Sequence, residues 1–382
     1  MFWILRNANL FCPDPVGFVD IVVCGRSVVT IGNTLPSLPD GLGPQCEIDL
    51  QGKRVVPGII DCHAHVTGGG GEAGPATRVP PLSITTIVEA GVTTVVGVLG
   101  TDGTTRTVRD LVATTNGLND QGITAWCYTG SYEVPPITLT GRVRDDVVFL
   151  APVVGVGEVA LSDHRSSQPT VAEIAKIAAD CHVAGLLTGK AGILHLHLGD
   201  GKRGLEIVRS LLDTAEIPAR VFHPTHCNRN PWLWADAMEL AMRGVTIDVT
   251  AYEGDCPGEL TAAQALLQYW DSGAPRERIT VSSDGGGCIP TFDSDGRMVQ
   301  MDVGRPHSLM ATVLSLVNSG VPLEQVLPPF TSNVAKLFRW PQKGRIAPGT
   351  DADLLVLDEA GHISDVMALG RWVVRKTVVE CF

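Results

Sequence analysis

The sequence lacks the features that mark a protein built for an oxidising environment. Its ten cysteines are scattered and contain no Cys-x-x-Cys pair, and there is no Asn-x-Ser/Thr glycosylation sequon. A fold held together by disulfides would be shorter and denser in cysteine. We therefore interpret the cysteines as reduced thiols and expect a cytoplasmic location.

Basic clusters and long apolar runs are also missing. The net charge is −12 and no stretch gathers lysine or arginine, which argues against a nucleic-acid partner. The apolar residues Met1 to Leu5 are interrupted by Arg6 and Asn7, so this run is too short for a signal segment or a membrane span. No membrane partner is expected, and the chain contains no internal repeat.

Hydrophobic residues make up 44% of the 382 residues, enough for one large core and a smaller second domain. Eight short apolar segments are typical of buried parallel strands: 59–65, 93–99, 124–128, 153–161, 193–197, 220–225, 246–250 and 279–283. Helix-length segments alternate with them, at 83–90, 171–184, 203–215 and 231–243. This alternation predicts the α/β class and a (β/α)8 TIM-like barrel.

The two ends of the chain have a different pattern. Short β-like segments occur at 2–6, 18–24, 27–31 and 47–50, and again at 353–357, 363–369 and 371–374. We expect these segments to pair as one small β-sandwich domain beside the barrel. The predicted division gives residues 1–55 and 341–382 to the sandwich and residues 56–340 to a metal-dependent barrel.

The segment Val56-Pro-Gly-Ile-Ile-Asp-Cys-His-Ala-His65 ends an apolar strand with two histidines. Alternate side chains of a strand point the same way, so His63 and His65 share a face and can chelate one divalent ion. Isolated His-x-His pairs are mostly surface or core residues. Here, Pro-Gly precedes the strand and a glycine-rich loop follows it, which favours a metal site.

Further candidate ligands end the later strands, where catalytic groups of such barrels lie. They are Glu158, His197, His226 and Asp284. His195 shares a face with His197 and is an alternative ligand, although the Gly-Asp turn after His197 favours the latter. Taken singly, these histidines could be core or surface residues and Asp284 could cap a helix. A lone buried Glu158 would be costly unless it were paired or bound to a metal.

Four histidines and two carboxylates on one face can hold two divalent ions about 3.5–4 Å apart. Ligands without cysteine favour Zn²⁺, with Mn²⁺, Co²⁺ or Fe²⁺ as alternatives. A water bridging the two ions would have its pKa lowered towards about 7, which yields a hydroxide nucleophile. Asp284 could then take the proton of the nucleophile and pass it to a leaving amine.

These residues resemble those of the amidohydrolase superfamily, and Gly344-Arg-Ile-Ala-Pro-Gly-Thr-Asp-Ala-Asp-Leu-Leu-Val resembles its C-terminal signature. Within that superfamily the chain is similar to the isoaspartyl dipeptidase family. The glycine-rich loop ending in Glu72, Ser162-Asp-His-Arg165 and Pro224-Thr-His-Cys-Asn-Arg-Asn230 carry this similarity. The resemblance implies hydrolysis of the β-aspartyl bond of dipeptides, a dipeptide substrate as the small-molecule partner, and a homo-oligomer.

The resemblance also implies roles for single side chains. Glu72 would hold the α-ammonium group of the β-linked aspartyl residue, and Arg229 would bind its α-carboxylate. Arg165 would bind a carboxylate of the leaving residue. Tyr132 would donate a hydrogen bond to the scissile carbonyl oxygen. Surface salt bridges for the arginines and core packing for Tyr132 are the alternative interpretations.

Two positions depart from the family pattern. Most members carry on the fourth strand a lysine that CO₂ converts to a metal-bridging carboxylate, whereas this chain has Glu158 there, with one extra residue between Gly155 and Ser162. We expect Glu158 to bridge the ions directly, without a carboxylated lysine; a degraded site with one ion is the alternative. Cys288 stands where the family has a serine that contacts substrate, and a thiol is a weaker hydrogen-bond partner.

Two other functions share parts of this pattern. A different amidohydrolase, acting on a cyclic amide such as a hydantoin or dihydroorotate or on an N-acyl amino acid, would use the same metal ligands. It would have no use for Glu72 together with Arg229. A non-catalytic assembly protein of the same fold would be expected to lose ligands, and here only the lysine has changed.

Overall fold

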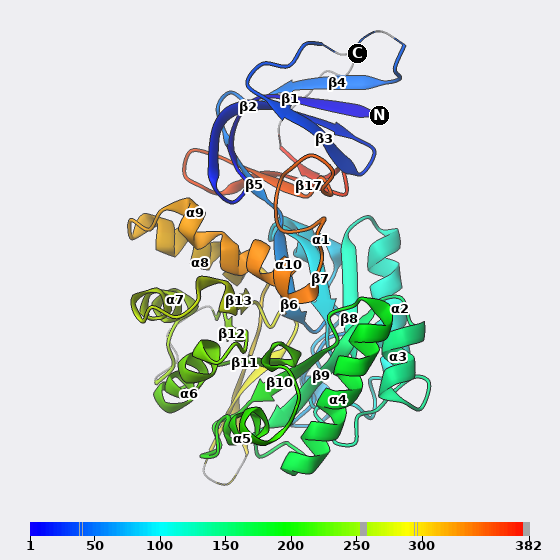
Figure 1. The fold of residues 1–382 in the computed structure, drawn as a ribbon, viewed down its shortest axis with the longest axis vertical. Coiled ribbons are helices and arrows are strands. Elements are labelled where there is room, and N and C mark those ends of the chain that lie inside the picture. The colour runs from blue at the N-terminus through cyan, green and yellow to red at the C-terminus, as the bar shows by residue number, and fades with distance from the viewer. Residues whose placement is uncertain (38, 40, 253–257, 294, 296, 377–382) are drawn as a thin grey trace.

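The computed structural model has a barrel with a small β-sheet at one end (Figure 1). It describes the whole chain except residues 38, 40, 253–257, 294, 296 and 377–382. The last six residues of the predicted segment 341–382 therefore lie outside the described residues, as do Cys256 and Cys381. No helix of the described part is long and apolar enough to cross a membrane.

Eight parallel strands form the barrel. They are β6 (Ile59–Ala64), β7 (Val92–Gly97), β8 (Thr124–Thr129), β9 (Val153–Leu161), β10 (Ile193–Leu198), β11 (Phe222–Thr225), β12 (Ile247–Thr250) and β13 (Ile279–Ser282). Strands β6 to β11 pair in chain order, and β12 pairs with β13. The Asp284 N–H donates to the His63 carbonyl oxygen at 3.1 Å, and Ala64 forms a parallel bridge with Gly285. These contacts bring the end of β13 beside β6 and close the barrel.

Helices cover the outside of the strands (Figure 1). The α-helices are α1 (Ile84–Glu89), α2 (Val108–Asp120), α3 (Val143–Phe149), α4 (Val171–Thr188), α5 (Glu206–Thr214), α6 (Pro231–Met242), α7 (Ala262–Asp271), α8 (His307–Asn318), α9 (Leu323–Val326) and α10 (Ser332–Phe338). Short 3-10 turns are η1 (Pro75–Thr77), η2 (Ala219–Val221), η3 (Arg276–Arg278) and η4 (Pro328–Phe330). Apolar side chains of strands and helices form one continuous core between the two layers.

Both chain ends contribute to one mixed sheet. Its strands are β1 (Phe2–Phe11), β2 (Pro15–Cys24), β3 (Ser27–Gly32), β4 (Gln45–Asp49), β5 (Arg54–Pro57), β16 (Leu354–Leu357), β17 (Ile363–Ala368) and β18 (Arg371–Arg375). The order is β18-β17-β16-β5-β1-β2-β3, with β4 beside β1. Figure 1 shows the N-terminal strands layered over the C-terminal ones, and Leu5, Ile21, Leu354 and Met367 are buried between them. A separate hairpin, β14 (Cys288–Phe292) and β15 (Met298–Val303), follows the barrel.

The expectation that every cysteine is a reduced thiol is wrong, as one described cysteine shows. Cys46, on β4, is disulfide-bonded. Seven other cysteines are free: Cys12, Cys24, Cys62, Cys127, Cys181, Cys227 and Cys288. Spacing along the chain does not report which thiols meet in space, so the sequence could not indicate this bond.

Candidate metal centre

Glu158 lies at the centre of four histidines at the C-terminal end of the barrel strands. Its Oε1 atom is 3.6 Å from His63 Nε2 and 3.4 Å from His65 Nε2. Its Oε2 atom is 3.1 Å from His197 Nδ1 and 3.7 Å from His226 Nε2. One carboxylate therefore faces one histidine pair with each oxygen, as a bridging ligand would.

Asp284 completes the group from the end of β13. Its Oδ1 atom is 3.4 Å from His63 Nε2 and 3.1 Å from His65 Nε2. Asp284 and His226 both have left-handed backbones, with φ of 52° and 60°. Such conformations are unfavourable for residues other than glycine and cluster at functional sites. Here they occur where the chain leaves β13 and β11.

A β-bulge in β9 places Glu158. Leu194 of β10 pairs with Val156 of β9, and Leu196 pairs with Val159. Two residues further along β10 thus correspond to three residues further along β9. The extra residue falls at Gly157–Glu158, where the sequence indicated an insertion. A bulge bends its strand and re-aims a side chain. A Cβ atom on Gly157 would lie 2.7 Å from His195 Cβ, so glycine lets β9 approach β10 closely.

The donor atoms of this group fit a divalent cation. His63 Nε2, Glu158 Oε1 and Asp284 Oδ1 are buried and have no hydrogen-bond partner within the described chain. Two sets of donors, His63-His65-Asp284 and His63-Glu158-His226, each lie within 4.8 Å of one another. Buried polar atoms are almost always paired, and the unpaired nitrogens and oxygens that converge here are of the kinds that bind a divalent cation. His197 belongs to neither set, although its Nδ1 faces Glu158.

The electrostatics of the site favour positive charge. Burial opposes ionisation of Glu158 and Asp284, but the neighbouring histidines outweigh it and hold both pKa values well below the usual range. Burial likewise opposes a charge on His63, and the Glu158 and Asp284 carboxylates outweigh it and raise its pKa to about 9. Both carboxylates are thus ionised and need a cationic partner.

Three of the histidines are held through their second ring nitrogen. His197 Nε2 lies 3.0 Å from Asp163 Oδ2, and His226 Nδ1 lies 2.7 Å from Thr250 Oγ1. His63 Nδ1 lies 2.8 Å from His195 Nε2. Such partners fix the orientation of a metal ligand. Sequence reasoning missed Asp163 and Thr250, and it considered His195 only as an alternative ligand; His195 lies behind His63 instead.

Two of the predicted substrate residues lie beside this group. The Tyr132 hydroxyl is 2.8 Å from His197 Nδ1, and burial is the main reason why its pKa is raised well above the usual value. Arg165 forms a two-point contact with Asp163, at 3.0 and 2.7 Å. Its Nη1 lies 3.6 Å from Glu72 Oε1. Tyr132 therefore keeps its proton, and the Arg165 guanidinium lies between the carboxylates of Asp163 and Glu72.

The remaining predicted substrate residues lie on neighbouring loops. Arg229 follows β11 and its Nη1 is 3.6 Å from Asp200 Oδ2. Cys288 begins β14, and burial together with the Glu72 carboxylate raises its pKa to about 12. The Thr101 hydroxyl donates to Glu72 Oε1 at 3.1 Å. Glu72, Arg165 and Cys288 thus lie close to one another beside His197, and Arg229 lies three residues after His226.

The fold agrees with the comparison with known families. The model of the amidohydrolase family matches residues 54–373. The chain belongs to the amidohydrolase family. The match covers the whole barrel and most of the C-terminal part of the end sheet.

Among solved structures, this amidohydrolase is similar to a β-aspartyl dipeptidase from Fervidobacterium islandicum AW-1 in complex with a β-Asp-Leu dipeptide. The identity is 40% and the TM-score is 0.92, over 100% of this chain and 99% of that one. An adenine deaminase of Serratia proteamaculans is 26% identical over 93% of this chain and 53% of its own length. An allantoinase of Desulfitobacterium hafniense is 40% identical over 62 residues, which is 16% of this chain and 13% of the allantoinase. The chain thus spans about half or less of these two curated relatives.

Proposed function

We propose that this member of the amidohydrolase family is a metal-dependent hydrolase that cleaves the β-aspartyl (isoaspartyl) bond of dipeptides. The observation that supports the proposal is Arg165, which lies 3.3 Å from His197 Nε2 and 3.6 Å from Glu72 Oε1, together with Arg229, three residues after His226 in the sequence. A zwitterionic β-aspartyl dipeptide carries one ammonium group and two carboxylates. The similarity to a β-aspartyl dipeptidase over the full chain supports the same substrate class.

The proposed metal ligands are His63, His65, Glu158, His197, His226 and Asp284. Two divalent ions, for which zinc is the expected element, would supply a hydroxide nucleophile at neutral pH and polarise the scissile carbonyl group. Glu158 would contact both ions through its two oxygens, which already face different histidines. No carboxylated lysine is needed in this arrangement.

The side chains around the ligands would bind and orient the dipeptide. Glu72 would accept the α-ammonium group, and Arg229 would bind the α-carboxylate of the aspartyl residue. When the dipeptide binds, Arg165 would leave Glu72 and pair with the carboxylate of the leaving residue. Cys288 would lie beside the leaving residue. These contacts would fix the scissile bond against the hydroxide nucleophile.

Two residues would act on the reacting atoms. Tyr132 keeps its proton because burial raises its pKa, so it can donate a hydrogen bond to the carbonyl oxygen as negative charge develops there. Asp284, whose carboxylate is ionised, would take the proton from the attacking oxygen and transfer it to the leaving amine.

The test compares two peptides of identical composition. Zinc-loaded protein is incubated with β-Asp-Leu and with α-Asp-Leu, and released leucine is measured. Cleavage of the β-linked peptide alone is expected. If neither peptide is cleaved by protein that binds two zinc ions, a cyclic amide or an N-acyl amino acid becomes the substrate to test. Lack of cleavage with fewer than two ions would support a degraded site or a non-catalytic role.

Oligomeric state and location complete the proposal. We propose a homo-oligomer, which size-exclusion chromatography with light scattering would test. A cytoplasmic location is supported by the seven free cysteines, whereas the disulfide at Cys46 counts against it. Free thiols can be counted in protein purified with and without alkylation before lysis. The comparison shows whether the Cys46 disulfide is already present in the cell or forms during purification.

A further inference from the structure

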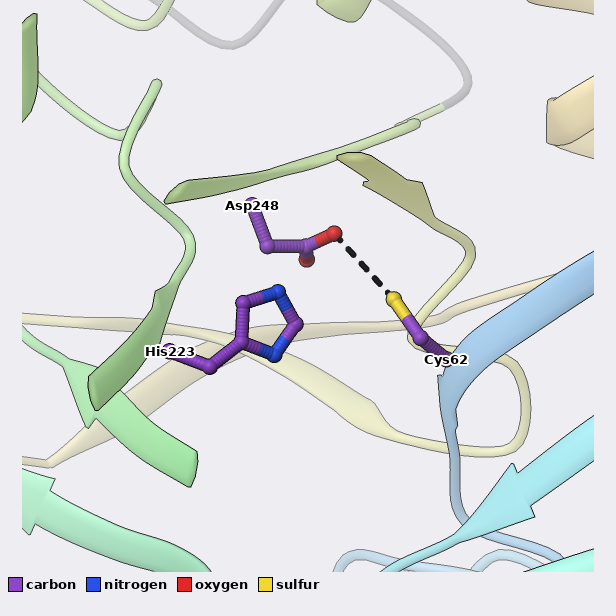
Figure 2. Close-up of side chains that lie close together, drawn as sticks. All are labelled: Cys62, His223 and Asp248. Carbon is purple, nitrogen blue, oxygen red and sulfur yellow. Dashed lines mark hydrogen bonds between the residues drawn. The ribbon is translucent and has the colours of Figure 1, made fainter. Parts of the chain in front are cut away.

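Cys62, His223 and Asp248, shown in Figure 2, form a second buried cluster that is linked through His195 to His63. Their side chains come from β6, β11 and β12, and all three are completely buried. Each offers an atom that could bind a metal, within 4.8 Å of the others. The hydrogen bonds of the cluster determine whether it is a second metal site.

The hydrogen bonds show a satisfied network. Asp248 Oδ1 accepts from Thr280 at 2.6 Å and from the Cys62 thiol at 3.3 Å, which is the dashed line in Figure 2. Its Oδ2 accepts from Thr225 at 2.7 Å and from Ser282 at 2.5 Å. Within the described chain, every side-chain nitrogen and oxygen of His223 and Asp248 has a hydrogen-bond partner, whereas the group around Glu158 has unpaired atoms. This cluster therefore needs no cation, and its hydrogen bonds serve another purpose.

The network continues to the metal-ligand residue His63. His63 Nδ1 is 2.8 Å from His195 Nε2, and His195 Nδ1 is 3.0 Å from both the Nδ1 and the carbonyl oxygen of His223. His223 Nε2 is 3.1 Å from Thr280 Oγ1, and Thr280 donates to Asp248. Each of these residues is completely buried.

Only one direction of donation is compatible with metal binding. If His63 Nε2 holds an ion, the ring proton sits on Nδ1 and is donated to His195 Nε2. His195 then carries its own proton on Nδ1 and donates it to His223. Burial lowers the pKa of His223 to about 4, so this ring is neutral, and its single proton is on Nε2, facing Thr280. The chain of donors thus runs in one sense from His63 to the Asp248 carboxylate.

We propose that His195, His223, Thr280 and Asp248 form a relay of positioning residues that fixes the tautomer and the ring orientation of His63 and increases the affinity of the proposed metal centre. A carboxylate behind a histidine raises the basicity of a metal ligand, and aligned hydrogen bonds in a dry interior polarise one another. Asp163 acts on His197 directly, whereas Asp248 acts on His63 through three intervening side chains. The inference rests on the proposed function only in requiring that the ligands bind metal.

The relay is tested by measuring zinc affinity through competition with a chelator, independently of activity. Thr280→Val removes the hydroxyl that links His223 to Asp248 and keeps the volume. Zinc binding is expected to weaken by about 10–100-fold. Thr280→Ser retains the hydroxyl and is expected to bind zinc as the unmodified protein does.

Thr225→Val is the matched control, because Thr225 donates to the same carboxylate but lies outside the path from His63. Unchanged zinc affinity in Thr280→Val, or an equal loss in Thr225→Val, would overturn the relay while leaving the proposed function intact. If Thr280→Val does not fold, His223→Phe keeps a ring beside His195 and breaks the same path. Unmodified protein that binds no zinc would overturn the proposed function and the relay together.

Discussion

At the scale of the residue, Glu158 has the most unusual position in the site. It is a completely buried carboxylate that faces four histidines, two through each oxygen. The sequence predicted both its proximity to the histidines and the inserted residue beside it. It could not predict Asp163 and Thr250, because their contacts with His197 and His226 depend on how the ends of different strands meet in space.

Glu158→Ala should reduce the number of bound zinc ions below two per chain, because the proposed bridge between the ions is lost. Metal analysis after dialysis measures this number. Glu89→Ala, an exposed acid on α1, is the control and should bind as many ions as the unmodified protein. Two ions at full occupancy in Glu158→Ala would refute the bridging role.

Tyr132→Phe should lower kcat for β-Asp-Leu by about 10²–10³-fold with little change in KM, since one hydrogen-bond donor to the developing oxyanion is lost. Steady-state kinetics on both parameters tests this. Tyr128→Phe is the matched control, because the Tyr128 hydroxyl is buried without a hydrogen-bond partner in the described chain and its ring packs on His195. A change in KM alone for Tyr132→Phe would reassign the residue to substrate binding.

At the scale of the element, strand positions were better predicted than helix positions. Short apolar segments rich in Val, Ile, Thr and Leu identified all eight barrel strands, although residues 220 and 221 belong to η2 rather than β11. The helix-length segments of the sequence predicted α1, α4, α5 and α6 but not α2, α3, α7 or α8. Threonine, asparagine and aspartate interrupt α2, for example, and its apolar face becomes evident only once it packs on β8.

Helix α4 begins with a capping box, which provides a prediction at this scale. The Thr170 hydroxyl accepts from the Glu173 N–H, and the Glu173 side chain accepts from the Thr170 N–H. Thr170→Ala should lower the free energy of unfolding by about 1 kcal/mol. Urea denaturation measures it. Thr188→Ala, at the other end of α4, should have a smaller effect, because its hydroxyl donates back to Ala184 and accepts from the Lys190 N–H, and so satisfies no N–H of the first helical turn. An equal decrease in the free energy of unfolding for Thr170→Ala and Thr188→Ala would contradict a stabilising role of the capping box.

At the scale of the whole molecule, Lys343 joins the end sheet to the barrel. Its buried ammonium group donates to Asp353 at 2.6 Å and to Thr124, the first residue of β8, at 2.6 Å, and lies 2.9 Å from Asp351. Composition and spacing could predict that the two chain ends pair, but not which side chains hold them. A lysine in a turn-rich segment gives no sign that it is buried.

Lys343→Met should destabilise the protein by about 3–5 kcal/mol, because two buried carboxylates lose their shared cation. The midpoint of thermal unfolding reports the loss. Lys336→Met removes an exposed lysine 3.9 Å from Glu277, and it should change stability by about 1 kcal/mol or less. Similar midpoints for the two variants would refute a structural role for Lys343.

The same ion pairs predict a dependence of stability on pH. Burial opposes ionisation of Asp351, but Arg26 and Lys343 outweigh it and lower its pKa. A lowered pKa in the folded state means that this contribution is fully present above the unfolded pKa of about 3.9 and is lost as pH falls further. Between pH 5 and 3, the free energy of unfolding should fall more steeply for the unmodified protein than for Asp351→Asn. If the free energy of unfolding changes with pH at the same slope in both proteins, ionised Asp351 does not contribute to stability.

The pairing of the two chain ends also has a consequence for the order of folding. Arg26 and Asp351, which form a two-point ion pair, are 325 residues apart, and β5 pairs with β16. Contacts between such distant residues carry a large loop-closure cost and form slowly. On the ribosome, strands β1 to β5 can pair with one another early, but the edge of β5 that faces β16 stays unpaired until almost the whole chain is made. Co-translational protection of that edge would matter more for the yield of native protein than the stability of the finished sheet.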